Sequence, residues 1–146
     1  MVVQDVINHL HDLAPLAYAE DFDNVGLLVG DKNQSITGVL VTLDTLEAVV
    51  DEAIEKGCNL IVSFHPIIFK GLKKITGKSY VERVVIKAIQ HKISIFAIHT
   101  ALDNAFHGVN SIICDQLNLK NKQILKPQKG TIKKLTTYVP KANAND

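Results

Sequence analysis

The fold follows from residues 38–64, which read GVLVTLDTLEAVVDEAIEKGCNLIVSF. Residues 38–43 and 59–64 are short, largely apolar and rich in β-branched side chains, as expected for strands that are buried on both faces. The segment between them has apolar residues that share one helical face: Leu46, Val49, Val50 and Ala53. Gly57 is a typical residue just after a helix end. The stretch therefore predicts two parallel strands joined by a right-handed helical crossover.

The same alternation of periods continues on both sides of this unit. An amphipathic helix is expected first, then a short strand that Gly30 ends, and after the central unit a helix capped by Ser79. Outside the central unit we thus expect helices at residues 2–13, 79–91 and 108–117 and strands at 27–29 and 93–98. Together they predict an α/β fold with a mostly parallel sheet and helices packed on its faces.

Composition excludes several classes of protein. The chain has 146 residues, of which 47% are hydrophobic and 21% charged, so disorder as the dominant state is excluded. The net charge of +1 supplies no electrostatic reason to expect a nucleic acid or an anionic membrane as partner. We find no signal peptide and no apolar run long enough to cross a bilayer, which predicts a cytoplasmic protein without a membrane partner. Cys58 and Cys114 are expected to be reduced core thiols.

The C-terminal residues follow a different pattern. Residues 131–140 begin another alternating strand, and residues 141–146 then end the chain with nothing for it to pair against. We therefore expect an α/β domain at 1–130 and the truncated start of an inserted or second module at 131–146. A frayed natural C-terminus is the alternative interpretation.

Polar side chains follow the three central strands where each strand ends. Asp44 follows the first, His65 the second, and His99 the third, with Asp103 four residues later. Because parallel strands point the same way and ligands bind beyond their carboxyl ends, these side chains are expected along one edge of the sheet. The loop that contains Asp23 is a further candidate for that edge. Imidazoles and carboxylates together predict a substrate site or a site for a divalent transition metal.

Each of these residues also has a purely structural interpretation. Asp44 could cap the next helix, and His65 could be a buried histidine satisfied by backbone. His99 could only hydrogen-bond across the edge, and Asp103 could belong to an ordinary turn. The functional hypothesis therefore depends on four residues sharing one place.

An ordered set of motifs resembles the NIF-three-like family, whose bacterial members are named GTP cyclohydrolase I type 2 homologues. The motifs stand in one order along nearly the whole chain: DNVGLLVG at 23–30, LD at 43–44, SFHPIIF at 63–69, HTALD at 99–103 and GVN at 108–110. The resemblance identifies the chain as similar to the N-terminal half of such a protein. It implies two α/β halves around a dinuclear metal site and assembly into a toroidal homohexamer.

The resemblance also implies roles for particular residues. His65 corresponds to the second histidine of the family's His-His pair and Asp103 to the metal-binding aspartate, with Zn, Mn or Fe as the expected ion and two ions per subunit in the family. Phe64 stands where the family usually has the first histidine, and a phenyl ring supplies no lone pair to a metal. The family's remaining ligands, a histidine and a glutamate near the far C-terminus, have no counterpart in this chain.

The expected function is therefore hydrolase-like, with divalent metals that activate water against a small-molecule substrate, as in GTP cyclohydrolysis. Asp44 and His99 are the candidates for orienting a metal ligand or moving a proton. The alternative is a metal-binding or regulatory assembly protein without catalysis of its own.

Overall fold

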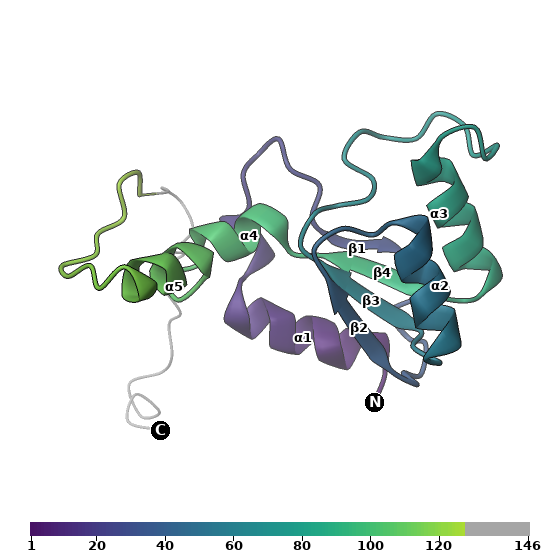
Figure 1. Cartoon of the computed structure of the whole chain (residues 1–146), viewed down its shortest axis with the longest axis horizontal. Coiled ribbons are helices and arrows are strands. Elements are labelled where there is room, and N and C mark those ends of the chain that lie inside the picture. The colour runs from purple at the N-terminus through teal and green to yellow at the C-terminus, as the bar shows by residue number, and fades with distance from the viewer. Residues whose placement is uncertain (128–146) are drawn as a thin grey trace, which may run out of the picture.

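The computed structural model describes residues 1–127, and its strands form one four-stranded sheet in the order β1-β4-β3-β2 (Figure 1). β2, β3 and β4 run parallel, and β1 runs antiparallel to β4. The strands are β1 (Gly26–Val29), β2 (Val39–Thr42), β3 (Leu60–Ser63) and β4 (Ser94–Ala97). This arrangement confirms the predicted α/β fold with a mostly parallel sheet. The boundary expected near residue 130 and the module expected at 131–146 lie outside the described residues.

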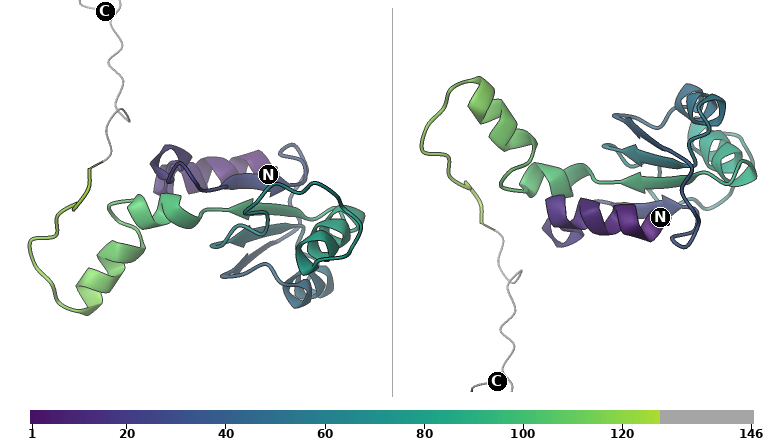
Figure 2. Two further views of the ribbon diagram at one scale, coloured as in Figure 1. Left: turned by 90° about the horizontal axis from the view of Figure 1, so that it is seen from above. Right: turned by 90° about the horizontal axis from the view of Figure 1, so that it is seen from below.

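Helices cover both faces of the sheet. The helical elements are α1 (Val3–Leu13), η1 (Leu16–Tyr18), α2 (Glu47–Glu55), α3 (Tyr80–Gln90), α4 (His99–Asn104) and α5 (Val109–Gln116). α2 and α3 lie on one face and α1 on the other, with the sheet between them (Figures 1 and 2). No helix among residues 1–127 is both long and apolar enough to cross a membrane.

The sheet separates two hydrophobic cores because successive residues of a strand point to opposite faces. Ile61 and Ile95 point toward α2 and α3, where they join Val50, Val84 and Ala88. On the other face the core contains Leu60, Val62 and Phe96 packed with Val3 and Ile7 of α1. β3 and β4 are buried along their whole length, as their apolar sequences predict.

The expectation that residues 38–43 are buried on both faces is wrong. β2 is an edge strand, and Val41 is 78% exposed although its register partner Val62 is 7% exposed. Leu40 packs against the core beneath α2 and α3, so β2 buries one face only. An apolar sequence does not distinguish an edge strand from a central one, because strand order depends on the whole chain.

The expectation that residues 108–117 pack on the sheet is also wrong. α5 has no buried residue, and it packs against α4 and extends away from the sheet (Figure 2). Its apolar residues Ile112 and Ile113 are 56% and 47% exposed. Periodicity predicted this helix and its apolar face, but it does not specify what covers that face. Cys58 and Cys114 are not joined in a disulfide and are half-buried, so neither is fully within a core; their reduced state stays a prediction.

A capping network begins α3 where the sequence predicted it. The Ser79 hydroxyl accepts a hydrogen bond from the Glu82 amide, as an N-cap does. The Glu82 carboxylate accepts hydrogen bonds from the amide and hydroxyl of Thr76, the amide of Lys78 and the hydroxyl of Ser79. The hydrogen bonds from Thr76, followed by those from Lys78 and Ser79, lower the pKa of Glu82 from 4.5 to about 2.

Glu82→Gln is expected to change how stability depends on pH. A carboxylate whose pKa is lowered by folding stabilises the protein fully at pH values above its unfolded pKa of 4.5. This stabilisation is lost as the pH falls toward the folded pKa of about 2. The variant should therefore unfold at lower denaturant than the wild type at pH 7, and the difference should shrink at pH 3. Glu55→Gln, which changes an exposed glutamate of α2, is the control. If the difference in unfolding denaturant concentration between Glu82→Gln and the wild type were the same at both pH values, the lowered pKa of Glu82 would be contradicted.

Candidate functional site

The candidate site begins with backbone hydrogen bonds that continue the parallel sheet past its strand ends. The amide of His65 donates to the Leu43 carbonyl at 2.9 Å, and the amide of His99 donates to the Phe64 carbonyl at 3.0 Å. These bonds place residues 44, 65 and 99 side by side beyond the carboxyl ends of β2, β3 and β4. The predicted gathering of Asp44, His65 and His99 at one edge is thus present in the structure.

Asp44 and His65 form a direct pair. The Nδ1 atom of His65 lies 2.8 Å from Oδ1 of Asp44, and both side chains are about half exposed. Because a carboxylate can only accept, Nδ1 carries the hydrogen, and in the neutral ring the lone pair lies on Nε2. The helix-cap interpretation of Asp44 does not hold, since Leu46 is the N-cap of α2.

Asp23 and His99 form a second pair, which is more buried. The Nδ1 atom of His99 donates to Oδ1 of Asp23 at 2.9 Å, and the Asp23 side chain is fully buried. The other oxygen of Asp23 accepts from the Thr100 amide at 3.2 Å and from the Thr100 hydroxyl. The Asp23 loop therefore reaches the same edge, as expected, and it is held there through the start of α4.

The pKa of Asp23 reflects two opposing effects. Burial raises the pKa of this carboxyl group, but hydrogen bonds from His99, Thr100 and the Asn24 amide outweigh burial. They hold the pKa below its ordinary value of 3.8. The side chain is therefore a buried carboxylate at neutral pH.

Aromatic rings surround the two histidines. The His65 and His99 ring centroids are 5.4 Å apart, and Phe64 lies 5.0 Å from His65 and 5.4 Å from His99 in edge-on contacts. Phe69 makes a fourth contact, 6.5 Å from His99. The side-chain amide of Asn24 donates to the Ile68 carbonyl and so ties the loop that follows His65 to the Asp23 loop. Phe64 thus occupies the centre of the site rather than its periphery.

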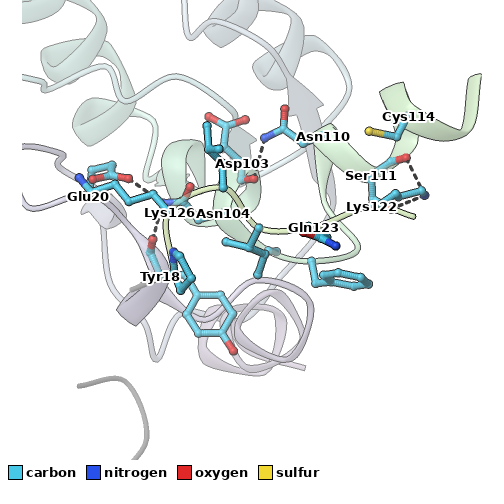
Figure 3. A pocket seen from close by; sticks show the side chains of 15 residues that line it. Tyr18, Glu20, Asp103, Asn104, Asn110, Ser111, Cys114, Lys122, Gln123 and Lys126 are labelled. Carbon is cyan, nitrogen blue, oxygen red and sulfur yellow. Dashed lines mark hydrogen bonds between the residues drawn. The ribbon is translucent and has the colours of Figure 1, made fainter. Parts of the chain in front are cut away.

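Asp103 lies on α4, one helical turn after His99, so the two residues share a side of that helix. It lines a cavity of about 680 Å³ between α4, α5 and residues 122–127, together with Glu20 and Asn110 (Figure 3). Within residues 1–127, no hydrogen bond or ring contact links the Asp103 carboxylate to either histidine. The turn that was the alternative for this residue is instead helix α4, which sequence periodicity did not reveal.

The imidazole and carboxylate groups at this edge are suitable ligands for a divalent transition metal, but too few of them lie together. An imidazole whose Nδ1 is held by a carboxylate is the usual arrangement of a metal-binding histidine, and His65 has it. However, no group of three or more His, Cys, Asp or Glu side chains among residues 1–127 is arranged to hold an ion. His65 and Asp103 thus fit a metal in chemistry and fall short of a complete ligand shell.

Comparison with known proteins decides the family. The sequence profile of the Duf34/NIF3 (NGG1p interacting factor 3) family matches residues 1–144. The chain belongs to the Duf34/NIF3 family. It is 44% identical over 143 residues to a protein of Staphylococcus aureus and 42% identical over 139 residues to one of Bacillus subtilis, both named GTP cyclohydrolase 1 type 2 homolog. The aligned regions are 98% and 94% of this chain but only 39% and 37% of those relatives.

Solved structures agree with this assignment to the Duf34/NIF3 family. A crystal structure of a Staphylococcus aureus protein superposes with a TM-score of 0.80 at 44% identity, covering 88% of this chain and 41% of that one. A Bacillus cereus protein related to NIF3 gives a TM-score of 0.81 at 36% identity, covering 88% and 35%. The sequence resemblance to the family is thereby confirmed, and the chain spans about two fifths of the length of these relatives.

Sequence reasoning missed two features of the site. It did not predict the hydrogen bonds between Asp23 and the start of α4, because these depend on β1 lying antiparallel beside β4. It also missed Phe69, whose only signal was an aromatic residue four positions after His65.

Proposed function

We propose that this Duf34/NIF3 protein is a metal-dependent, hydrolase-like protein that uses the carboxyl edge of its sheet to activate water against a small-molecule substrate. The observation that supports this most directly is the Asp44–His65 pair, which places the hydrogen of the neutral His65 ring on Nδ1 and its lone pair on Nε2. The convergence of His99 on the same edge is the second support.

Each residue has a separate role in this proposal. His65 and Asp103 would hold a divalent ion such as Zn, Mn or Fe. The family resemblance implies two ions per subunit, and a smaller number, which Phe64 and the missing distal ligands favour, points to the second candidate below. A bound divalent ion lowers the pKa of its water and polarises a carbonyl or phosphoryl group. Asp44 orients the His65 ring. His99, through Nε2, can accept a proton from a water or a substrate.

The proposed reaction is tested with GTP, the substrate that the relatives' printed name suggests. Purified protein is incubated with GTP and Mn, Zn or Fe, and the products are separated by chromatography and identified by mass spectrometry. We expect a formylated or ring-opened product that requires metal. If no product forms with any of the three metals while metal is bound, the hydrolase proposal fails.

A non-catalytic metal-binding or regulatory assembly protein is the second candidate. Phe64 favours it, since an aromatic ring with no lone pair contacts both histidines at the centre of the site. Elemental analysis separates the two candidates. Two tightly held ions per subunit would favour the enzyme, and one or none would favour the binding protein.

Assembly and location belong to the same proposal. We propose a homohexamer in the cytoplasm, with no membrane and no nucleic acid as partner. Sedimentation velocity of the purified protein tests the assembly, and a monomer at micromolar concentration would contradict it.

A further inference from the structure

The two carboxylate–histidine pairs at the sheet edge differ in how they are buried. The Asp23 side chain is 0% exposed and the His99 side chain 19%, whereas Asp44 and His65 are 52% and 46% exposed. Water can compete for the hydrogen bond of the exposed pair, but it does not reach the carboxylate of the buried one. The hydrogen bond that orients His99 is therefore shielded from water at its carboxylate end.

The Asp23 carboxylate has a donor at each of its accepting positions. Oδ1 accepts from Nδ1 of His99 at 2.9 Å and from the Asn24 amide at 2.8 Å. Oδ2 accepts from the amide and the hydroxyl of Thr100. A carboxylate offers about four such positions, so Asp23 is saturated and has none for a further hydrogen atom. Because the acceptor is a carboxylate, the hydrogen in the pair must lie on Nδ1 of His99.

The backbone at His99 is also constrained. His99 has a φ of +29°, which side-chain-bearing residues rarely adopt, and it is the first residue of α4. Such conformations persist only where the surroundings determine them, and they concentrate at functional sites. The bonds from His99 and Thr100 to Asp23, together with the bond from the His99 amide to the Phe64 carbonyl, are those surroundings.

We propose that Asp23 is a positioning residue that fixes His99 in the tautomer with hydrogen on Nδ1 and an unprotonated Nε2 at the sheet edge. Through Thr100 it also anchors the first turn of α4, one turn before Asp103. Its importance for catalysis rests on the proposed function, in which Nε2 of His99 accepts a proton. The tautomer itself depends on neither metal nor substrate.

Nitrogen-15 NMR of the histidine rings in the metal-free, 146-residue protein tests this proposal. Spectra are recorded at pH 9, about 2.5 units above the ordinary imidazole pKa. The His99 resonances are assigned with His99→Gln. We expect a protonated Nδ1 and an unprotonated Nε2 for His99 in the wild type. A proton on Nε2, in a neutral or a cationic ring, would overturn the proposal, and this wild-type result stands even if a variant fails to fold.

Asp23→Asn then tests the cause. The amide keeps the shape of the side chain but can donate to Nδ1, so we expect His99 to shift toward the tautomer with hydrogen on Nε2. Asp44→Asn is the matched control, which should change the His65 resonances and leave those of His99 in place. Backbone amide spectra confirm that each variant is folded. An unchanged His99 tautomer in folded Asp23→Asn would show that Asp23 does not set it.

Discussion

Val62→Asp is expected to abolish cooperative folding, whereas Val41→Asp should leave the protein folded. Val62 lies on the central strand β3 and is 7% exposed, in the core formed with α1. A carboxylate there would be buried without a partner, which costs several kcal/mol, and domains are stable by only about 5–15 kcal/mol. Urea denaturation followed by circular dichroism measures the effect.

Val41 is a close control for this substitution. It is the register partner of Val62 on the neighbouring strand, yet it is 78% exposed because β2 is the edge strand. The same change should therefore cost less than about 1 kcal/mol, mainly through the poor strand propensity of aspartate. Equal destabilisation by the two substitutions would mean that the strand order is wrong.

His65→Ala and Asp103→Ala are expected to weaken metal binding by at least about 100-fold, because each removes a proposed ligand rather than a residue that supports one. Asp44→Asn should weaken it less, by about 10-fold to 100-fold, since it leaves the ligand in place and removes its orientation. Calorimetric titration with Mn²⁺ or Zn²⁺ measures all three. Circular dichroism should show that each variant remains folded, because the exposed pair stabilises the core little.

His91→Ala is the control for a general loss of histidine. His91 is exposed at the end of α3, just before β4 begins, and so lies at the opposite edge of the sheet. Its removal should leave affinity unchanged. If His91→Ala weakened binding as much as His65→Ala, or if His65→Ala had no effect, the ligands would be misassigned.

Local patterns were sufficient to predict much of this fold. The cap at Ser79, the positions of β3 and β4 along the chain and the end of α2 before Gly57 all depend on neighbours in the sequence, and the structure has each of them. Gly57 has a φ of +66°, the left-handed conformation that glycine commonly adopts just after a helix end. Because local sequence determines these features, they can be predicted from a single sequence.

The errors share a different physical cause. The exposure of Val41 depends on which strand is at the edge, and the exposure of Ile112 depends on what packs against α5. Both are properties of the tertiary arrangement, which periodicity does not contain. The same distinction holds for the site. The strand ends were sufficient to predict that Asp44, His65 and His99 meet. The pairing of Asp23 with His99 could not be predicted, because it depends on where β1 lies in the sheet.

We propose that the carboxyl edge of the sheet is a metal site that includes His65 and Asp103. Crystals grown with Mn²⁺ or Zn²⁺, with data collected at the metal's absorption edge, test it most directly. We expect an anomalous peak about 2.0–2.2 Å from Nε2 of His65 and within ligand distance of an Asp103 oxygen. Anomalous peaks only elsewhere on the protein, or an Asp103 carboxylate too far away to share an ion with His65, would contradict it.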